Sequence, residues 1–146
     1  MSAGYSRKSL SQKLGIKQRS VIALLNAPGG YDGLLGELPD EVIVTRGLKG
    51  RLDFIQFFVT DRVGLERGFP RLKASLKRGR IVWVSWPKAS SRLRTDLSDG
   101  VVREVGLKNG LVDVKVCAVD DSWSALKFVR RLKDREENLH PKNRKV

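Results

Sequence analysis

Two strand-like runs, Leu111-Val-Asp-Val-Lys-Val-Cys-Ala-Val119 and Trp123-Ser-Ala-Leu-Lys-Phe-Val129, lie near the end of the chain and are separated only by Asp120-Asp-Ser122. Strands joined by three residues pair as an antiparallel hairpin. A helix-like stretch precedes the hairpin, and the apolar run Ile81–Trp86 precedes that stretch. Because parallel strands need a long crossover, usually a helix, the sequence predicts a sheet that is parallel until its last strand.

The rest of the chain alternates strand-like and helix-like segments in the same way. Further strands are expected at 20–27, 41–45 and 52–59, and helices at 9–14, 31–38, 61–77 and 96–108, with 61–77 split into two short helices at Pro70. This order predicts an α/β fold, a Rossmann-like three-layer sandwich of about six strands, mostly parallel with an antiparallel terminal hairpin. Only about eight residues separate the second strand from the third. This is too few for the helix-strand-helix segment that lies at this point in the complete order of elements of a class I methyltransferase. We therefore expect a truncated methyltransferase-like fold.

Length and composition limit the classes of protein that the chain can belong to. The 146 residues are expected to form one domain, residues 1–133, followed by a basic and flexible tail, residues 134–146. Cys117 is the only cysteine and His140 the only histidine, which excludes a disulfide framework and argues against a Ser-His-Asp triad or a His-rich metal site. No apolar run approaches the roughly 18 residues of a membrane span, so we expect a cytoplasmic protein with no membrane partner.

The formal net charge is +13, and the basic residues are concentrated in three stretches. Residues 1–19 contain five basic residues and no acid, residues 67–95 contain nine and no acid, and residues 127–146 contain eight against three acids. Such a concentration of positive charge attracts phosphates and acidic surfaces, although the same charge can simply keep a protein in solution. We therefore expect nucleic acid or an acidic protein as a partner. The candidates for polyanion contact are Arg71, Lys77, Arg78, Arg92 and Arg94.

The turn after the first strand is where a Rossmann fold usually holds its cofactor. Here it reads Asn26-Ala27-Pro28-Gly29-Gly30, without the G-x-G-x-x-G spacing that lets the backbone approach a diphosphate. The second strand ends at Thr45 and is followed by Arg46, where an acid would bind the ribose hydroxyls. We therefore expect no cofactor, and binding of S-adenosylmethionine or NAD(P) weaker than about 1 mM. The alternative is that Asn26, Pro28, Gly29 and Gly30 still line a ligand site.

Polar residues after the fourth strand form a second candidate region. Lys88 follows Trp86-Pro87, and the loop beyond it leads to Thr95 and Asp96 at the start of the expected helix. A helix N-terminus with basic residues beside it can hold an anion. In the alternative interpretation, Thr95 or Asp96 only caps the helix.

The terminal hairpin contributes the remaining ligand-binding candidates, Lys115, Asp120, Trp123 and Lys127. Strand alternation predicts that Asp113 and Lys115 share one face of their strand, opposite the valines. A lysine buried alone would cost several kcal/mol, so Lys115 must be paired or reach water. Trp123 is expected to pack on the sheet.

From Tyr5 to Arg130 the chain resembles a bacterial family of small proteins defined only by a domain of unknown function. The likeness rests on Lys13-Leu-Gly-Ile-Lys17, Ala27-Pro28, Leu34-Leu35, Trp86-Pro87-Lys88, Thr95-Asp96-Leu97 and, above all, Val112-Asp-Val-Lys-Val-Cys-Ala-Val-Asp120 with Trp123-Ser124. The resemblance implies no reaction, because none is established for the family. Asn26 and Gly29-Gly30 make the first loop richer in glycine than the family pattern, so the resemblance gives this loop no binding role.

Three functions remain open. The first is a non-enzymatic domain that binds a partner or a polyanion, with nucleic acid the leading candidate, because the cofactor signature is missing and a long stretch lacks acids. The second is a small-ligand protein for a nucleotide or an S-adenosylmethionine-like compound, or a degenerate methyltransferase, using the turn 26–30 and the loop 88–96. The third is a protein-protein adaptor. The sequence leaves the oligomeric state open.

Overall fold

The computed structural model describes residues 8–131, apart from the side chain of Arg78 and the burial of Gly79. The expected tail, residues 134–146, and His140 therefore lie outside the described residues. The elements in chain order are α1 (Leu10–Leu14), β1 (Val21–Leu25), α2 (Tyr31–Leu35), β2 (Ile43–Thr45), β3 (Leu52–Phe58), α3 (Arg62–Ser75), β4 (Leu76–Pro87), α4 (Asp99–Lys108), β5 (Leu111–Ala118) and β6 (Trp123–Arg130).

The six strands form one sheet in the order β2-β1-β3-β4-β6-β5. The pairs β1/β2, β1/β3 and β3/β4 are parallel, whereas β6 is antiparallel to both β4 and β5. The predicted fold is confirmed: the sheet is mostly parallel and ends in an antiparallel hairpin. The strand order reverses next to β1, because the chain moves from β1 outward to β2 and then back past β1 to β3.

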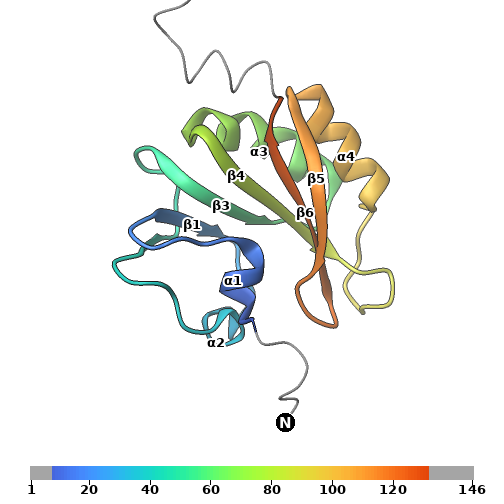
Figure 1. Ribbon diagram of the computed structural model, residues 1–146. Helices are drawn as coiled ribbons and strands as arrows, with labels where there is room; N and C mark the ends of the chain where they lie inside the picture. Colours follow the sequence, from blue (N-terminus) through green and yellow to red (C-terminus); the bar gives the residue numbers. More distant parts are fainter. Residues whose placement is uncertain (1–7, 132–146) are drawn as a thin grey trace, which may run out of the picture.

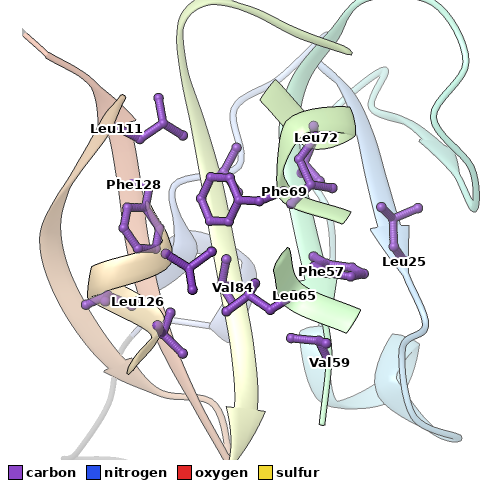
Figure 2. Packing of buried hydrophobic residues seen from close by; sticks show 14 of the residues in the cluster. Leu25, Phe57, Val59, Leu65, Phe69, Leu72, Val84, Leu111, Leu126 and Phe128 are labelled. Carbon is purple, nitrogen blue, oxygen red and sulfur yellow. The ribbon is translucent and has the colours of Figure 1, made fainter. Parts of the chain in front are cut away.

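One face of the sheet is covered by the two longest helices, α3 and α4 (Figure 1). Leu65, Phe69 and Leu72 of α3 are fully buried against the sheet, and Phe69 meets Phe128 edge to face with ring centroids 5.4 Å apart (Figure 2). Apolar residues at i, i+4 and i+7 lie on one side of a helix. The layer between these helices and the sheet is almost wholly apolar, and it forms the larger core cluster.

The opposite face is covered only by the two five-residue helices, α1 and α2. Buried polar groups link this thin layer to the sheet. The Tyr31 hydroxyl donates to Gln56 Oε1 at 2.6 Å, and Gln56 Nε2 donates to the Ser85 hydroxyl at 3.0 Å. Trp83 Nε1 donates to the carbonyl of Leu14 at 2.8 Å. The buried side chains of Tyr31, Gln56, Ser85 and Trp83 thus all have hydrogen-bond partners, as the cost of an unpaired polar group requires.

The connection from β2 to β3 contains no helix. Residues 46–51 pass from one end of the sheet to the other on the side of α3, where Leu48 packs against the larger core cluster. Parallel crossovers usually take a dozen or more residues and contain a helix, and a helix fills the space above the strand that it crosses. This extended crossover confirms that the helix-strand-helix segment is missing, and it leaves space beside α3.

Two helix predictions were wrong in detail. Pro70 does not separate two helices, because α3 runs continuously from Arg62 to Ser75 with this proline inside it. Burial of Phe69 and Leu72 on either side of Pro70 outweighs the lost backbone hydrogen bond, which is a tertiary effect. The last helix begins at Asp99 rather than 96, because Ser98 is its N-cap and accepts from the Val101 N–H.

Strand β5 also differs from the simple alternation expected of it. Asp113 lies opposite Phe128 and Lys115 lies opposite Lys127, with an irregularity at Val114 between them. A bulge inserts one residue and reverses the faces beyond it. Asp113 therefore points toward α4, where Arg103 donates to it at 2.9 Å, and the prediction that Asp113 and Lys115 share a face was wrong. Lys115 is exposed and reaches water.

No helix among residues 8–131 is both long and apolar enough to cross a membrane.

Candidate ligand site at the carboxyl edge of the sheet

The carboxyl ends of β1 and β3 meet where the strand order reverses, which is where open α/β sheets bind ligands. Asn26 follows β1 and has a left-handed backbone, with φ of 60°. Its side-chain amide donates to the carbonyl of Phe58, the last residue of β3, at 3.3 Å. Asparagine tolerates this conformation better than most residues, since its short polar side chain can bond locally. Asn26 thus ties the two strand ends together at the rim of the edge.

A crevice of about 660 Å³ opens beside Asn26, and we call it the switch-point crevice. Its volume is in the usual range for small-molecule sites. The crevice lies between the extended crossover and α3, in the space that a crossover helix would fill. It is lined by Leu25, Asn26, Gly47, Leu48, Phe57, Phe58, Val59, Thr60, Asp61, Gly64, Arg67, Gly68, Arg71, Leu72 and Trp123.

The walls of the switch-point crevice differ in chemistry. Its floor is apolar and includes Leu25 and Phe57 (Figure 2). Arg67 and Arg71 lie one helical turn apart on α3 and are exposed. Gly68 lets the helix approach the sheet closely, because a Cβ at this position would lie 3.0 Å from the Phe57 ring. The crevice can therefore hold a flat apolar group and an anionic group at the same time.

A second hollow, of about 680 Å³, lies between the first loop and the tip of the terminal hairpin. It brings together several predicted residues from distant parts of the sequence: Pro28, Gly29, Gly30, Arg92, Asp120 and Trp123. Trp123 lines both this hollow and the switch-point crevice. Its ring is buried and stands edge to face on Phe58, with centroids 5.1 Å apart, which bears out its expected packing.

Arg46 follows β2, at the position where a Rossmann fold usually has an acid that binds the ribose hydroxyls. It donates through Nη2 to both carboxylate oxygens of Asp32 in α2, at 3.1 and 3.0 Å. This exposed pair borders a third, smaller hollow of about 440 Å³, which Asn26 also lines. The nearest carboxylate to that hollow is thus held by an arginine.

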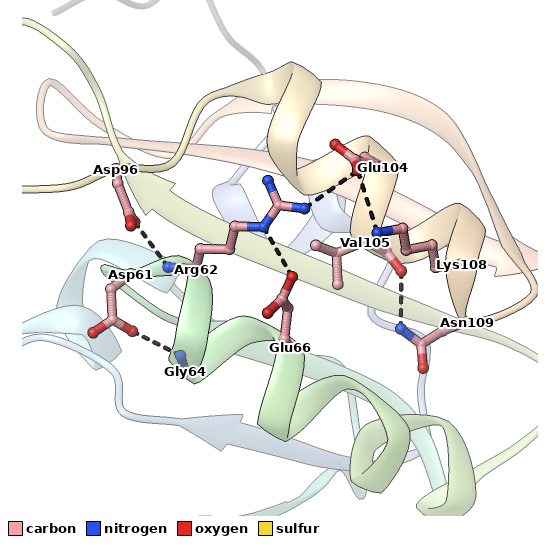
Figure 3. A network of polar contacts seen from close by, with 9 residues as sticks. All are labelled: Asp61, Arg62, Gly64, Glu66, Asp96, Glu104, Val105, Lys108 and Asn109. Atoms are coloured by element: carbon pink, nitrogen blue, oxygen red, sulfur yellow. Dashed lines mark hydrogen bonds and ion pairs between the residues drawn. The ribbon is translucent and has the colours of Figure 1, made fainter.

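The loop between β4 and α4 has mainly structural contacts. Asp96 accepts from the backbone N–H of Arg62 at 2.8 Å, so it caps α3 and not the helix that follows it in sequence (Figure 3). The Thr95 hydroxyl donates to the carbonyl of Thr60 at 2.6 Å. Lys88 is half-buried, and its backbone N–H donates to the Ser122 carbonyl. These contacts hold the loop to the edge. The prediction that Thr95 or Asp96 caps the helix that follows was wrong, because Ser98 is the N-cap of α4.

Asp120 also has a local role, because its carboxylate accepts from the backbone N–H groups of Ser122 and Trp123 and so shapes the hairpin turn. Lys115 and Lys127 do not lie at the carboxyl edge where β1 and β3 end. They lie opposite each other within the hairpin, on the face of α1 and α2.

Of the five residues proposed for polyanion contact, the four whose side chains the structure describes do not gather on one surface. Arg71 lines the switch-point crevice and Arg92 lines the second hollow. Arg94 is exposed on the loop that joins β4 to α4. Lys77 lies at the start of β4 and pairs with Asp53 at 3.2 Å. Arg78 is in the same strand, and its side chain lies outside the described part of the chain.

Sequence reasoning found Asn26 and Trp123 but missed much of the crevice. Gly47 and Leu48 of the crossover were not candidates, and neither was Arg67, although it lies in the acid-free basic stretch 67–95. The short gap between β2 and β3 was the available signal, because a crossover without a helix leaves space. Among residues 8–131 no three His, Cys, Asp or Glu side chains are grouped to hold a metal ion.

The chain is similar in structure to class I methyltransferases. It matches a fibrillarin pre-rRNA processing protein from Methanococcus jannaschii with a TM-score of 0.59 and 15% identity over 79% of this chain and 68% of that one. It matches magnesium protoporphyrin IX methyltransferase from Synechocystis, solved with bound SAM, with a TM-score of 0.52 and 10% identity over 83% and 74%. Aeropyrum pernix fibrillarin, with natively bound S-adenosyl-L-methionine, gives a TM-score of 0.55 and 11% identity over 78% and 68%. No protein-family model and no curated protein matches the sequence. At these identities the likeness shows a methyltransferase-like fold.

Proposed function

We propose that this protein binds a small phosphorylated ligand of the nucleotide class in the switch-point crevice, on a framework that no longer transfers methyl groups. The observation that carries the proposal is the crevice itself, which opens at the strand-order reversal next to Asn26. Rossmann-like sheets bind nucleotides at this place. Two of the similar structures were solved with S-adenosylmethionine, which supports a ligand with an adenosine-like part.

The charges of the crevice favour a phosphate over a sulfonium. Arg67 and Arg71 present two cations from one wall, and guanidinium groups bind phosphate oxygens with charge-assisted hydrogen bonds. The same pair repels the positive sulfur of S-adenosylmethionine. Asp61 is the acid of the crevice, and it accepts from the Gly64 N–H at the start of α3.

The floor and rim suit the remainder of a nucleotide. Leu25, Leu48 and Phe57 offer apolar surface to a base, and the Asn26 and Thr60 side chains offer polar atoms at the rim. A pocket with an apolar lining and a few polar groups is typical of small-molecule sites. The earlier expectation that S-adenosylmethionine binds more weakly than about 1 mM stays a prediction and agrees with this proposal.

Isothermal titration calorimetry with AMP, adenosine and S-adenosylmethionine tests the proposal. AMP should bind most tightly. The double variant Arg67→Gln/Arg71→Gln should lose about tenfold in AMP affinity per arginine, because one charged hydrogen bond contributes about 1.5 kcal/mol or more, and it should leave adenosine unaffected. Asn26→Gly keeps the left-handed backbone and removes the amide, so it should weaken AMP and adenosine alike.

The matched control is Arg51→Gln/Arg94→Gln, which removes the same charge away from the crevice and should leave AMP binding unchanged. Equal losses in the two double variants would mean that only the overall charge attracts AMP. Micromolar binding of S-adenosylmethionine would overturn the phosphate assignment, and no binding of any of the three compounds would overturn the site.

A further inference from the structure

Three lysines converge on the face of the sheet opposite α3 and α4. Lys115 of β5 lies directly opposite Lys127 of β6 in the antiparallel ladder. Residues in such positions have Cβ atoms about 4.5 to 5.5 Å apart, and like charges placed there destabilise the pair. The fold thus holds two cations together across one rung of the sheet.

The third lysine comes from the segment after α1. Lys127 lies opposite Trp83 in the β4/β6 ladder, and Trp83 Nε1 donates to the carbonyl of Leu14. This bond fixes the chain just before Lys17 over the same part of the sheet. The pKa of Lys127 is lowered from its ordinary value. The largest cause is burial, followed by the charge of Lys115 and then that of Lys17. The ammonium groups of Lys17 and Lys115 therefore both act on that of Lys127. We call them the lysine cluster.

The cluster has no compensating acid within the part of the chain that the structure describes. None of the salt bridges between residues 8 and 131 includes Lys17, Lys115 or Lys127. Asp113, two residues before Lys115, is turned to the other face by the bulge and pairs there with Arg103. An anion from outside the chain would relieve the repulsion, which no ion pair within residues 8–131 relieves.

We propose that Lys17, Lys115 and Lys127 form a contact site for the phosphodiester backbone of a nucleic acid. Lys17 and Lys115 are exposed and Lys127 is half-buried, so their long side chains can reach a phosphate chain that passes over this face. The formal net charge of +13 adds long-range attraction for a polyanion. Backbone contacts of this kind position a protein without reading sequence. The site is separate from the switch-point crevice and does not depend on it.

Fluorescence anisotropy with a labelled duplex and a labelled single strand, titrated at several salt concentrations, tests the proposal. Each phosphate contact contributes about 0.7 to 0.9 to the logarithmic salt slope. The triple variant Lys17→Gln/Lys115→Gln/Lys127→Gln should lower the slope by about two to three, with little dependence on sequence. Its melting temperature should not fall, because the lysines repel one another.

The matched control, Arg51→Gln/Arg92→Gln/Arg94→Gln, removes the same charge from exposed residues outside both the lysine cluster and the switch-point crevice. It should lower the slope by less than about one. Equal slopes in the two variants would overturn the proposal, as would no binding of the unaltered protein at about 50 mM salt, where electrostatic affinity is greatest. A parallel titration with inorganic phosphate and pyrophosphate shows whether the cluster binds small free anions or the phosphates of a nucleic acid. If these bind to the cluster and oligonucleotides do not, the site is a small-anion site and the nucleic-acid proposal is wrong.

Discussion

The two faces of the sheet are held by different forces. On the face of α3 and α4, two long helices bury a continuous apolar layer, and exposed ion pairs join the helices to each other. Arg62 of α3 reaches both Glu66 and Glu104 (Figure 3), and the pKa of Glu104 is lowered by the hydrogen bond from Lys108 first and that from Arg62 second. On the other face, two single-turn helices bury less and depend on buried hydrogen bonds.

This difference separates stability from binding. The apolar layer tolerates little change in volume, because protein interiors are packed as densely as crystals. The thin layer leaves part of β5 and β6 uncovered, and the lysine cluster lies there. The switch-point crevice, in turn, lies on the well-packed face at the place where a helix is missing. Both proposed sites therefore lie where one layer of the sandwich is incomplete.

Adding one methyl group to the well-packed face should give the largest effect. A Cβ at Gly106 of α4 would lie 2.1 Å from the Phe128 ring, so a side chain or the helix must move. Gly106→Ala should lower the free energy of unfolding by about 2 kcal/mol, the typical cost of overpacking less the gain in helix propensity. Urea denaturation measures the change.

The control for Gly106 is Gly100 in the same helix. A Cβ there meets only the Ser98 hydroxyl oxygen at 3.9 Å, an ordinary contact. Gly100→Ala should therefore raise the free energy of unfolding by about 0.5 to 1 kcal/mol, through helix propensity alone. Similar values for the two variants would show that α4 is not packed tightly on Phe128.

On the thin face, a smaller loss is expected from Tyr31→Phe. The variant removes the donor to Gln56 Oε1 and leaves that buried oxygen without its partner, which should cost about 1 to 2 kcal/mol. Burial raises the pKa of the Tyr31 hydroxyl above its ordinary value, so the hydroxyl stays a donor at neutral pH. Adding Gln56→Leu together with Ser85→Ala should restore part of the stability, since all three side chains of the buried hydrogen-bonded chain then lack polar groups. No restoration would mean that shape, and not hydrogen bonding, holds this layer.

The smallest effect, and of opposite sign, is expected from Lys127→Met, which should raise stability by less than about 1 kcal/mol. The folded-state pKa of Lys127 is lowered, so between that value and the ordinary pKa of about 10.4 the unfolded chain binds a proton that the folded chain lacks. Stability should therefore rise with pH across this window. Denaturation at pH 8 and pH 10 should show the rise in the unaltered protein and a flatter response in the variant. A loss of stability on removing this charge would contradict the repulsion within the cluster.

Much of the fold was predictable because its signals are local. The three-residue gap before Trp123 permits only a hairpin, and the missing residues between β2 and β3 show a truncation without any structure. The capping pattern was predictable only in part. Asp96 has the right residue type for a cap, but the helix that it caps is α3, more than thirty residues earlier in the chain. A cap supplied by a distant segment leaves no local pattern.

The candidate sites were less predictable, for the same physical reason. The composition of the chain by itself determined its strongly basic character. Residue spacing determined how strands and helices alternate along the chain, because short-range backbone geometry depends on neighbouring residues. Tertiary structure alone decided which cations meet. The bulge at Val114 turns Lys115 toward Lys127 and Asp113 away, and the extended crossover opens a crevice in front of Arg67. Such meetings depend on register and on unfilled space, and both arise only when distant segments pack together.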